Sequence, residues 1–161
     1  MAGKNYFVLA LFLAACFSAA VIGSAFTTKS VHEWYPQLRK PPGTPPPWVF
    51  APVWTTLYIL MAIASWLVWE HAGGWSGAHR ALSLFFIQLV LNALWSVLFF
   101  GLRKPAAGLA EILLLWLAIL ATVKAFFPLS HLAGWLMMPY LLWVSYAGYL
   151  NFGLWSLNRA Q

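Results

Sequence analysis

Residues 6–26 read YFVLALFLAACFSAAVIGSAF, an apolar stretch without a charged side chain. An α-helix rises about 1.5 Å per residue, so a run of this length can cross the roughly 30 Å hydrocarbon core of a bilayer. Four further apolar runs follow at about 48–69, 81–102, 106–127 and 132–157. Because the runs do not alternate apolar with polar residues as barrel strands do, they predict a bundle of five transmembrane helices.

The composition also predicts a membrane protein with one domain. Hydrophobic residues make up 63% of the 161 residues, charged residues make up only 7%, and the mean hydropathy is +0.78. A soluble domain could not cover its surface with so little charge. Nearly every stretch long enough to fold alone belongs to an apolar run, so we expect residues 1–161 to form a single all-α membrane domain.

The first run has a second interpretation, because Leu13-Ala14-Ala15-Cys16 resembles the lipoprotein cleavage site of a bacterial signal peptide. Apolar sequence continues to Phe26, however, which a processed signal would not require. We therefore favour a membrane-spanning helix with Cys16 as a small buried residue. A single cysteine provides neither an internal disulfide nor a cysteine cluster for zinc.

The basic residues are divided unequally between the two sides of the predicted topology. One side holds six of the nine, namely Lys29, Arg39, Lys40, Arg103, Lys104 and Arg159. The other side holds Lys4, Arg80 and Lys124. Because Lys and Arg stay on the cytoplasmic face, we expect the N-terminus outside and the C-terminus on the cytoplasmic side, near anionic lipid headgroups. Basic residues scattered over both faces exclude nucleic acid as an expected partner.

Short loops and the lack of an arginine-rich amphipathic leader favour a bacterial origin. Small residues recur at every fourth position of the first helix, at Ala15, Ala19 and Gly23. Such a stripe allows close helix approach, either in a homodimer or within one subunit.

The connection at 27–47 is the longest, and it holds six of the ten prolines together with Trp34 and Tyr35. Prolines restrict the chain to extended or turn geometry and remove backbone donors. A stiff, aromatic loop is a candidate lid over a cavity between helix ends. It is equally a candidate for a rigid spacer on the headgroups, anchored by its two aromatic residues.

Polar and aromatic residues share one face on three of the predicted helices. These stripes consist of Trp54 and Tyr58, of Gln88, Asn92, Trp95 and Phe99, and of Tyr140, Trp143, Ala147 and Asn151. Amides are unfavourable in hydrocarbon without hydrogen-bond partners, so these amides should face the bundle interior. Hydrogen bonding between helices and aromatic packing would be enough to explain the stripes without any ligand. Three aromatic stripes beneath a stiff loop also suit a cavity for a flat, apolar ligand, and indoles stack better on a tetrapyrrole than on a sterol.

Short blocks between Trp34 and Asn151 match, in order, the motifs of a known family. They comprise Trp34-Tyr35, Leu38-Arg39-Lys40-Pro41, Pro45-Pro46, Trp48-Val49-Phe50, Pro52-Val53-Trp54-Thr55, Leu57-Tyr58, Gln88-Leu89, Leu91-Asn92, Trp95, Phe99-Phe100-Gly101, Pro139-Tyr140, Trp143, Ala147 and Leu150-Asn151. With the matching helix count, these blocks resemble the tryptophan-rich sensory protein/translocator protein (TspO) family, also called peripheral-type benzodiazepine receptors.

The resemblance implies a five-helix membrane protein, commonly a homodimer, that binds porphyrins, cholesterol and benzodiazepine-type drugs in a pocket closed by the first loop. The matching positions, together with the third-helix stripe, give the expected ligand-binding residues as Trp34, Trp54, Tyr58, Asn92, Trp95, Phe99, Trp143 and Ala147. The family often has a tryptophan where Gly43 stands, so the lid is expected to be looser.

Tetrapyrroles are the expected ligands, with a cholesterol or lipid carrier as the alternative. The family's cholesterol consensus near the C-terminus lacks its tyrosine and basic residue here, where Phe152 and Ser156 stand. A similar pattern at Val31, Tyr35 and Arg39 is too loose to identify a sterol site.

Candidate catalytic residues are few. Glu33, Glu70 and Glu111 are too far apart in the predicted topology to form an acid–base pair, and no nucleophilic or metal-ligating constellation is recognisable. Histidines near helix ends are more typical of the membrane interface than of haem ligation. We expect a binding protein with porphyrin as its ligand and no required cofactor or metal. The resemblance leaves open a light-dependent breakdown of porphyrin in which Trp54 and Trp143 would participate.

Overall fold

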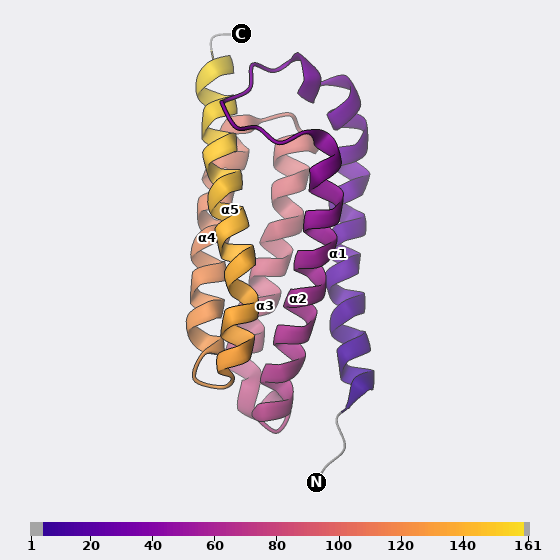
Figure 1. Cartoon of the computed structure of the whole chain (residues 1–161), viewed down its shortest axis with the longest axis vertical. Helices are drawn as coiled ribbons and strands as arrows, with labels where there is room; N and C mark the ends of the chain where they lie inside the picture. The colour runs from indigo at the N-terminus through magenta and orange to yellow at the C-terminus, as the bar shows by residue number, and fades with distance from the viewer. Residues whose placement is uncertain (1–4, 160–161) are drawn as a thin grey trace.

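The computed structural model describes residues 5–159, which form five long α-helices and no strand (Figure 1). The helices are α1 (Tyr6–Glu33), α2 (Phe50–His71), α3 (Trp75–Ser96), α4 (Pro105–Phe126) and α5 (His131–Asn158). Three short helical segments join them: the 3-10 turns η1 (Tyr35–Gln37) and η2 (Pro47–Val49), and the π-helix η3 (Val97–Gly101), which continues α3. The predicted all-α fold is confirmed. Lys4, counted in the predicted orientation, lies outside the described residues.

The helices lie roughly side by side along the long axis of the molecule (Figure 1). Consecutive helices run antiparallel, and α4 packs between α3 and α5 while α1 packs on α2 and α3. The ends of α1, α3 and α5 therefore lie at the same end of the bundle as the starts of α2 and α4. We call this the loop end, because the 34–46 segment crosses it.

Four helical stretches are long and apolar enough to cross a membrane, namely Tyr6–Glu33, Pro47–His71, Trp75–Gly101 and Pro105–Phe126. The fifth helix, α5, is as long as α1 but is not among them. Its tryptophans, tyrosines and amides lower its hydropathy, because each carries a polar group. The crossing of the membrane by α5 stays a prediction.

Two of the predicted boundaries were wrong. The first helix continues to Glu33 instead of ending at residue 26, and the third begins at Trp75 instead of at residue 81. In α1 the hydroxyl of Thr28 donates back to the carbonyl of Ser24, so polar residues extend the helix without leaving donors unpaired. An apolar run indicates the residues that lie in the hydrocarbon core, whereas the helix itself can continue into the membrane–water interface. The loop is shorter as a result.

The small-residue stripe of α1 packs inside the subunit. Ala19 and Gly23 are buried, and a β-carbon on Gly23 would lie 3.1 Å from the hydroxyl oxygen of Ser96 on α3. Cys16 is also buried within this helix. The stripe therefore serves contact between α1 and α3, and it provides no support for a dimer.

Candidate ligand-binding site

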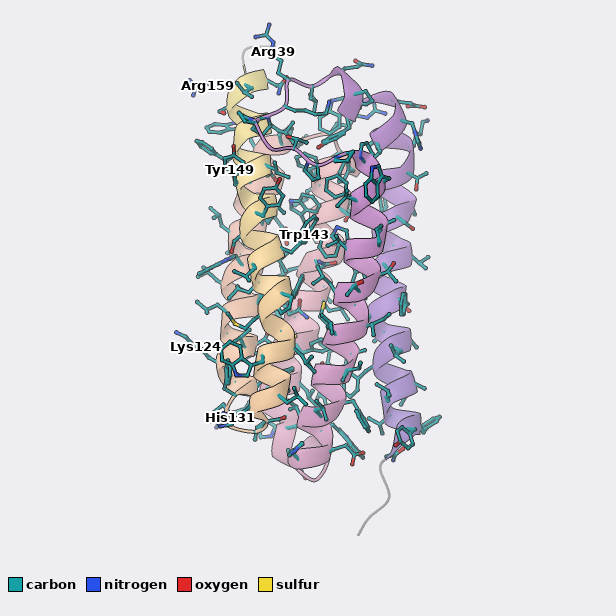
Figure 2. The ribbon with its side chains drawn as sticks, in the orientation of Figure 1. Arg39, Lys124, His131, Trp143, Tyr149 and Arg159 are labelled. Atoms are coloured by element: carbon teal, nitrogen blue, oxygen red, sulfur yellow. The ribbon has the colours of Figure 1, made fainter. Side chains whose placement is uncertain are left out.

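The loop-end half of the bundle contains a cavity of about 490 Å³ between α1, α2, α3 and α5. Large aromatic side chains from all four helices line it, together with Tyr35 and Pro47 at the start and end of the loop. Figure 2 shows Trp143 in this half of the molecule, below the crossing loop. Cavities of this size ordinarily hold small organic ligands.

Six of the eight residues expected from the sequence line this cavity. They are Trp54 and Tyr58 on α2, Asn92 and Trp95 on α3, and Trp143 and Ala147 on α5. Trp54 lies beside Tyr58 with ring centroids 5.7 Å apart, and the rings of Trp54 and Tyr140 meet edge to face at 6.2 Å. The helical spacing brought these six together as expected, while their contact with a ligand stays a prediction.

Trp34 and Phe99 do not line the cavity. Their rings meet edge to face, with centroids 5.7 Å apart, and Phe99 stacks behind Trp95 at 5.1 Å. The π-helix η3 explains why Phe100 lines the cavity in place of Phe99. A π-helix has more residues per turn than an α-helix, so the residue that faces the cavity comes one position later. At the end of α1, the η1 turn likewise presents Tyr35 in place of Trp34.

The sequence interpretation missed the α1 wall. Phe17, Val21, Ser24, Thr28 and His32 line the cavity from this helix. Their spacing of three or four residues marks one helical face, and the hydroxyls in an otherwise apolar run are the signal that could have found it.

The cavity opens between α1 and α2. Val21, Ser24 and Thr28 on α1 are exposed, as are Ala51 and Thr55 on α2. The residues from α3 and α5 that line the opposite wall are buried or half-buried. In a membrane, such an opening would face the bilayer along the side of the bundle.

Hydrogen bonds between helices fix the deep wall. Tyr58 donates from its hydroxyl to Oδ1 of Asn92 at 2.6 Å, and Nδ2 of Asn92 donates to the hydroxyl of Tyr140 at 2.9 Å. One amide thereby connects α2, α3 and α5. The expected placement of the amides inside the bundle is confirmed, because Gln88, Asn92 and Asn151 are all buried.

A second amide connects the helices nearer the loop end. Nε1 of Trp95 donates to Oδ1 of Asn151 at 3.1 Å, and Nδ2 of Asn151 donates to the carbonyl of Pro105 at 2.8 Å. Within residues 5–159, by contrast, the buried Nε1 of Trp143 has no hydrogen-bond partner. An unused donor on a cavity-lining side chain is suited to a ligand acceptor.

The 38–46 segment is attached to α5 by hydrogen bonds. Tyr146 donates to the carbonyl of Gly43 through a short hydrogen bond, and Tyr149 donates to the carbonyl of Pro42 at 3.1 Å. Asn158 exchanges two hydrogen bonds with the backbone of Arg39, at 3.0 and 2.9 Å. These bonds restrain the loop at the position where Gly43, with φ +81°, had suggested a looser lid.

A close approach and a buried phenol complete this attachment. Gly153 on α5 admits the ring of Pro41, since a β-carbon there would lie 2.6 Å from it. Burial, and secondarily the neighbouring Tyr146, raise the pKa of Tyr35 above its ordinary value near 10, so its hydroxyl is neutral at physiological pH.

The acidic residues lie in three separate places. Glu33 pairs with Arg103 at 3.2 Å, and Glu70 accepts a hydrogen bond from the backbone of Asn5. Glu111 is buried on α4. Across residues 5–159, no group of three or more metal-ligating side chains is brought together.

Comparison with known proteins identifies the family. A family model described as TspO/MBR matches residues 12–156. The chain is 44% identical to the tryptophan-rich protein TspO of Chlorobaculum tepidum, over 96% of this chain and 98% of that protein. It is 42% identical to the tryptophan-rich sensory protein of Cereibacter sphaeroides (91% and 89%) and 39% identical to the translocator protein of Bos taurus (87% and 83%). The chain is therefore an integral, multi-pass membrane protein that belongs to the TspO/MBR family.

Proposed function

We propose that this chain is a membrane-embedded sensor or binding protein for tetrapyrroles, which takes a porphyrin such as protoporphyrin into the cavity. One observation carries the proposal: Trp54, Trp95 and Trp143, from three different helices, line the same space. Indole faces stack on a conjugated macrocycle, whereas a saturated sterol ring offers them only apolar contact. A sensing role agrees with the name of the tryptophan-rich sensory protein of Cereibacter sphaeroides.

The chemistry of the cavity suits a ligand with a flat apolar body and a few polar groups. Its walls are mainly aromatic and aliphatic, and the amide of Asn92 is already engaged by two tyrosines. His32 and Thr28 lie where the cavity approaches the loop end. The carboxylates of a porphyrin would reach water on this side, while the macrocycle enters from the bilayer between α1 and α2.

A titration in darkness tests the proposal. Protoporphyrin added to the purified protein in detergent should quench tryptophan fluorescence saturably, and Trp143→Ala should weaken binding roughly tenfold through lost stacking. Trp135→Ala is the matched control, because Trp135 lies on the same helix but is 63% exposed and outside the cavity. Absence of saturation, or equal weakening by both substitutions, would refute a stacking site at Trp143.

Light-dependent breakdown of porphyrin is a second candidate function, favoured by the position of Trp54 and Trp143 on the wall of one cavity. A porphyrin excited by light would take one electron from an indole held against it, which gives a porphyrin radical anion and an indole radical cation. Dissolved dioxygen would be the oxidant for the breakdown of the macrocycle. Illuminated protoporphyrin should then bleach more slowly with Trp54→Phe and Trp143→Phe proteins than with the parent. Equal bleaching rates under matched occupancy would exclude a role for these indoles.

The proposed arrangement in the membrane has the N-terminus outside, the C-terminus on the cytoplasmic side and two subunits in a homodimer. Cysteines introduced in the loop-end connections should react with an impermeant thiol reagent only after the cytoplasmic face is opened. Labelling of these cysteines in intact cells would mean that the protein has the opposite orientation. Cross-linking through cysteines on the outer faces of α1 and α3 would locate the dimer contact.

A further inference from the structure

A second hollow, of about 360 Å³, lies at the loop end where α4 begins and α5 ends. Lys104, Ala106 and Ala107 line it from the start of α4, and Trp155 and Arg159 line it from the end of α5. Figure 2 shows Arg159 at the loop end of α5. This hollow is separate from the cavity between α1, α2, α3 and α5, because the two share no lining residue.

The charges around this hollow are unbalanced. The only ion pair recorded within residues 5–159 joins Arg103 to Glu33, so Lys104 and Arg159 lack an acidic partner there. Arg159 instead lies over the ring of Trp155, 5.8 Å from its centroid. The first turn of α4 contains no acidic residue and receives no side-chain cap. Two cations thus adjoin a helix start that itself favours negative charge.

The imbalance extends across the loop end. Lys29, Arg39 and Lys40 lie at the same end of the bundle, where Glu33 is the single acidic residue of the described chain. The opposite end carries Arg80, Lys124 and the acidic Glu70. The loop end is therefore the strongly positive one, and a membrane leaflet rich in anionic lipid would attract it.

An apolar surface continues from the hollow towards the middle of α5. The ring of Phe152 lies 5.9 Å from that of Trp155, and Phe152 is 53% exposed. In a bilayer this surface would lie against acyl chains, directly below the level of the two cations. If Lys104 and Arg159 held a lipid headgroup, the acyl chains attached to it could lie against this apolar surface. A free phosphate ion has no acyl chains, so the apolar surface favours a lipid as the ligand.

We propose that the hollow between the start of α4 and the end of α5 binds the phosphate of an anionic phospholipid, with Lys104 and Arg159 as its charged ligands. Charge-assisted hydrogen bonds from both side chains hold the phosphate oxygens. Trp155 and Phe152 contact the glycerol region and the upper acyl chain. The proposal is independent of which ligand occupies the cavity between α1, α2, α3 and α5.

Native mass spectrometry of the detergent-purified protein tests it, with phosphatidylglycerol and phosphatidylcholine of identical acyl chains as probes. The parent should retain phosphatidylglycerol preferentially. The Lys104→Gln/Arg159→Gln protein should bind it about 25-fold more weakly, because each lost charge should weaken binding about fivefold. The control is Arg80→Gln/Lys124→Gln, which removes the same charge at the opposite end and should change binding less than twofold.

The conservative Lys104→Arg protein should retain the lipid, and circular dichroism should show unchanged helicity in every variant. Equal loss of lipid from the two double variants would mean general electrostatic attraction and would overturn the site. Displacement of phosphatidylglycerol by millimolar inorganic phosphate would show an ion site, and would overturn the assignment to a lipid. Equal retention of both lipids by the parent would also overturn it.

Discussion

The two halves of the bundle contain similar helices but are filled differently. Away from the loop end, Phe85 and Phe126 stack at 6.3 Å and Met61, Leu82 and Met137 are fully buried, so side chains occupy the space between helices. Towards the loop end, tryptophans and tyrosines surround a cavity. Phenylalanine and aliphatic residues interdigitate freely, whereas tyrosine and tryptophan are constrained by the hydrogen bonds of their polar groups.

This difference suggests that one half provides stability and the other provides binding. Substitutions in the packed half should reduce stability and spare ligand affinity, whereas those in the open half should do the reverse. Four experiments follow from this contrast.

The largest effect is expected in the packed half. Phe85→Ala would leave a void among fully buried residues and should lower the free energy of unfolding by about 3–5 kcal/mol. Unfolding by a denaturing detergent, followed by circular dichroism, measures the change. Protoporphyrin affinity of the folded fraction should be unchanged, and Phe86→Ala, at a 37% exposed neighbour, should cost much less. A similar loss for both would contradict the contrast.

Asn92 lies on the boundary between the halves. Asn92→Leu would leave the hydroxyls of Tyr58 and Tyr140 without their shared amide, at a cost of about 2 kcal/mol in unfolding free energy. Adding Tyr58→Phe should recover part of that loss, because it removes one of the two unpartnered groups. The four proteins form a double-mutant cycle by detergent unfolding. Simple additivity would show that the hydrogen bonds do not act together.

Filling the cavity should affect binding more than stability. Ala147→Leu places three carbons against the space lined by Trp143 and should weaken protoporphyrin binding roughly tenfold. Gly148→Leu is the neighbouring control, because a β-carbon at Gly148 would meet no atom within 4 Å. Fluorescence titration and thermal unfolding should separate the effects. Unchanged affinity in the Ala147 variant would place the ligand elsewhere.

The smallest effect concerns the loop. Tyr146→Phe removes the hydrogen bond to the carbonyl of Gly43 but leaves the ring in place, so equilibrium affinity should change by about threefold or less. The dissociation rate, measured by stopped-flow displacement, should rise by at least as much. Tyr149→Phe, which removes the longer bond to Pro42, should have a weaker effect. Identical rates in all three proteins would mean that the loop does not restrict the ligand.

Much of this arrangement was predictable from the apolar runs and the helical spacing within α2, α3 and α5. Trp54, Asn92 and Trp143 converged because each lies on a face that a regular helix defines. The exchange of Phe99 for Phe100 was not predictable, because a π-helix changes the period locally and has no simple sequence signal. The end of α1 and the start of α3 were predicted wrongly, because the hydropathy of a segment depends on whether it lies in hydrocarbon and only indirectly on its backbone geometry.

The contacts between the loop and α5 were also beyond sequence reasoning. Tyr146 meets Gly43, and Asn158 meets Arg39, across more than 100 residues of chain. Such pairs depend on how the helices are assembled, which local patterns do not encode. The α1 wall was missed for another reason: its hydroxyl residues bond to their own helix and resemble ordinary membrane-helix serines and threonines.

The hydrogen bonds between the loop and α5 begin in the same helical turns that form the wall of the cavity. Trp143 and Ala147 line the cavity, while Tyr146 and Tyr149, within two turns of Trp143, donate hydrogen bonds to the carbonyls of Gly43 and Pro42. A guest that rotates this stretch of helix would therefore displace the 38–46 segment too. Binding of a ligand in the cavity, within the bilayer, would then change the position of a segment exposed to the aqueous phase. A partner there could recognise this change directly.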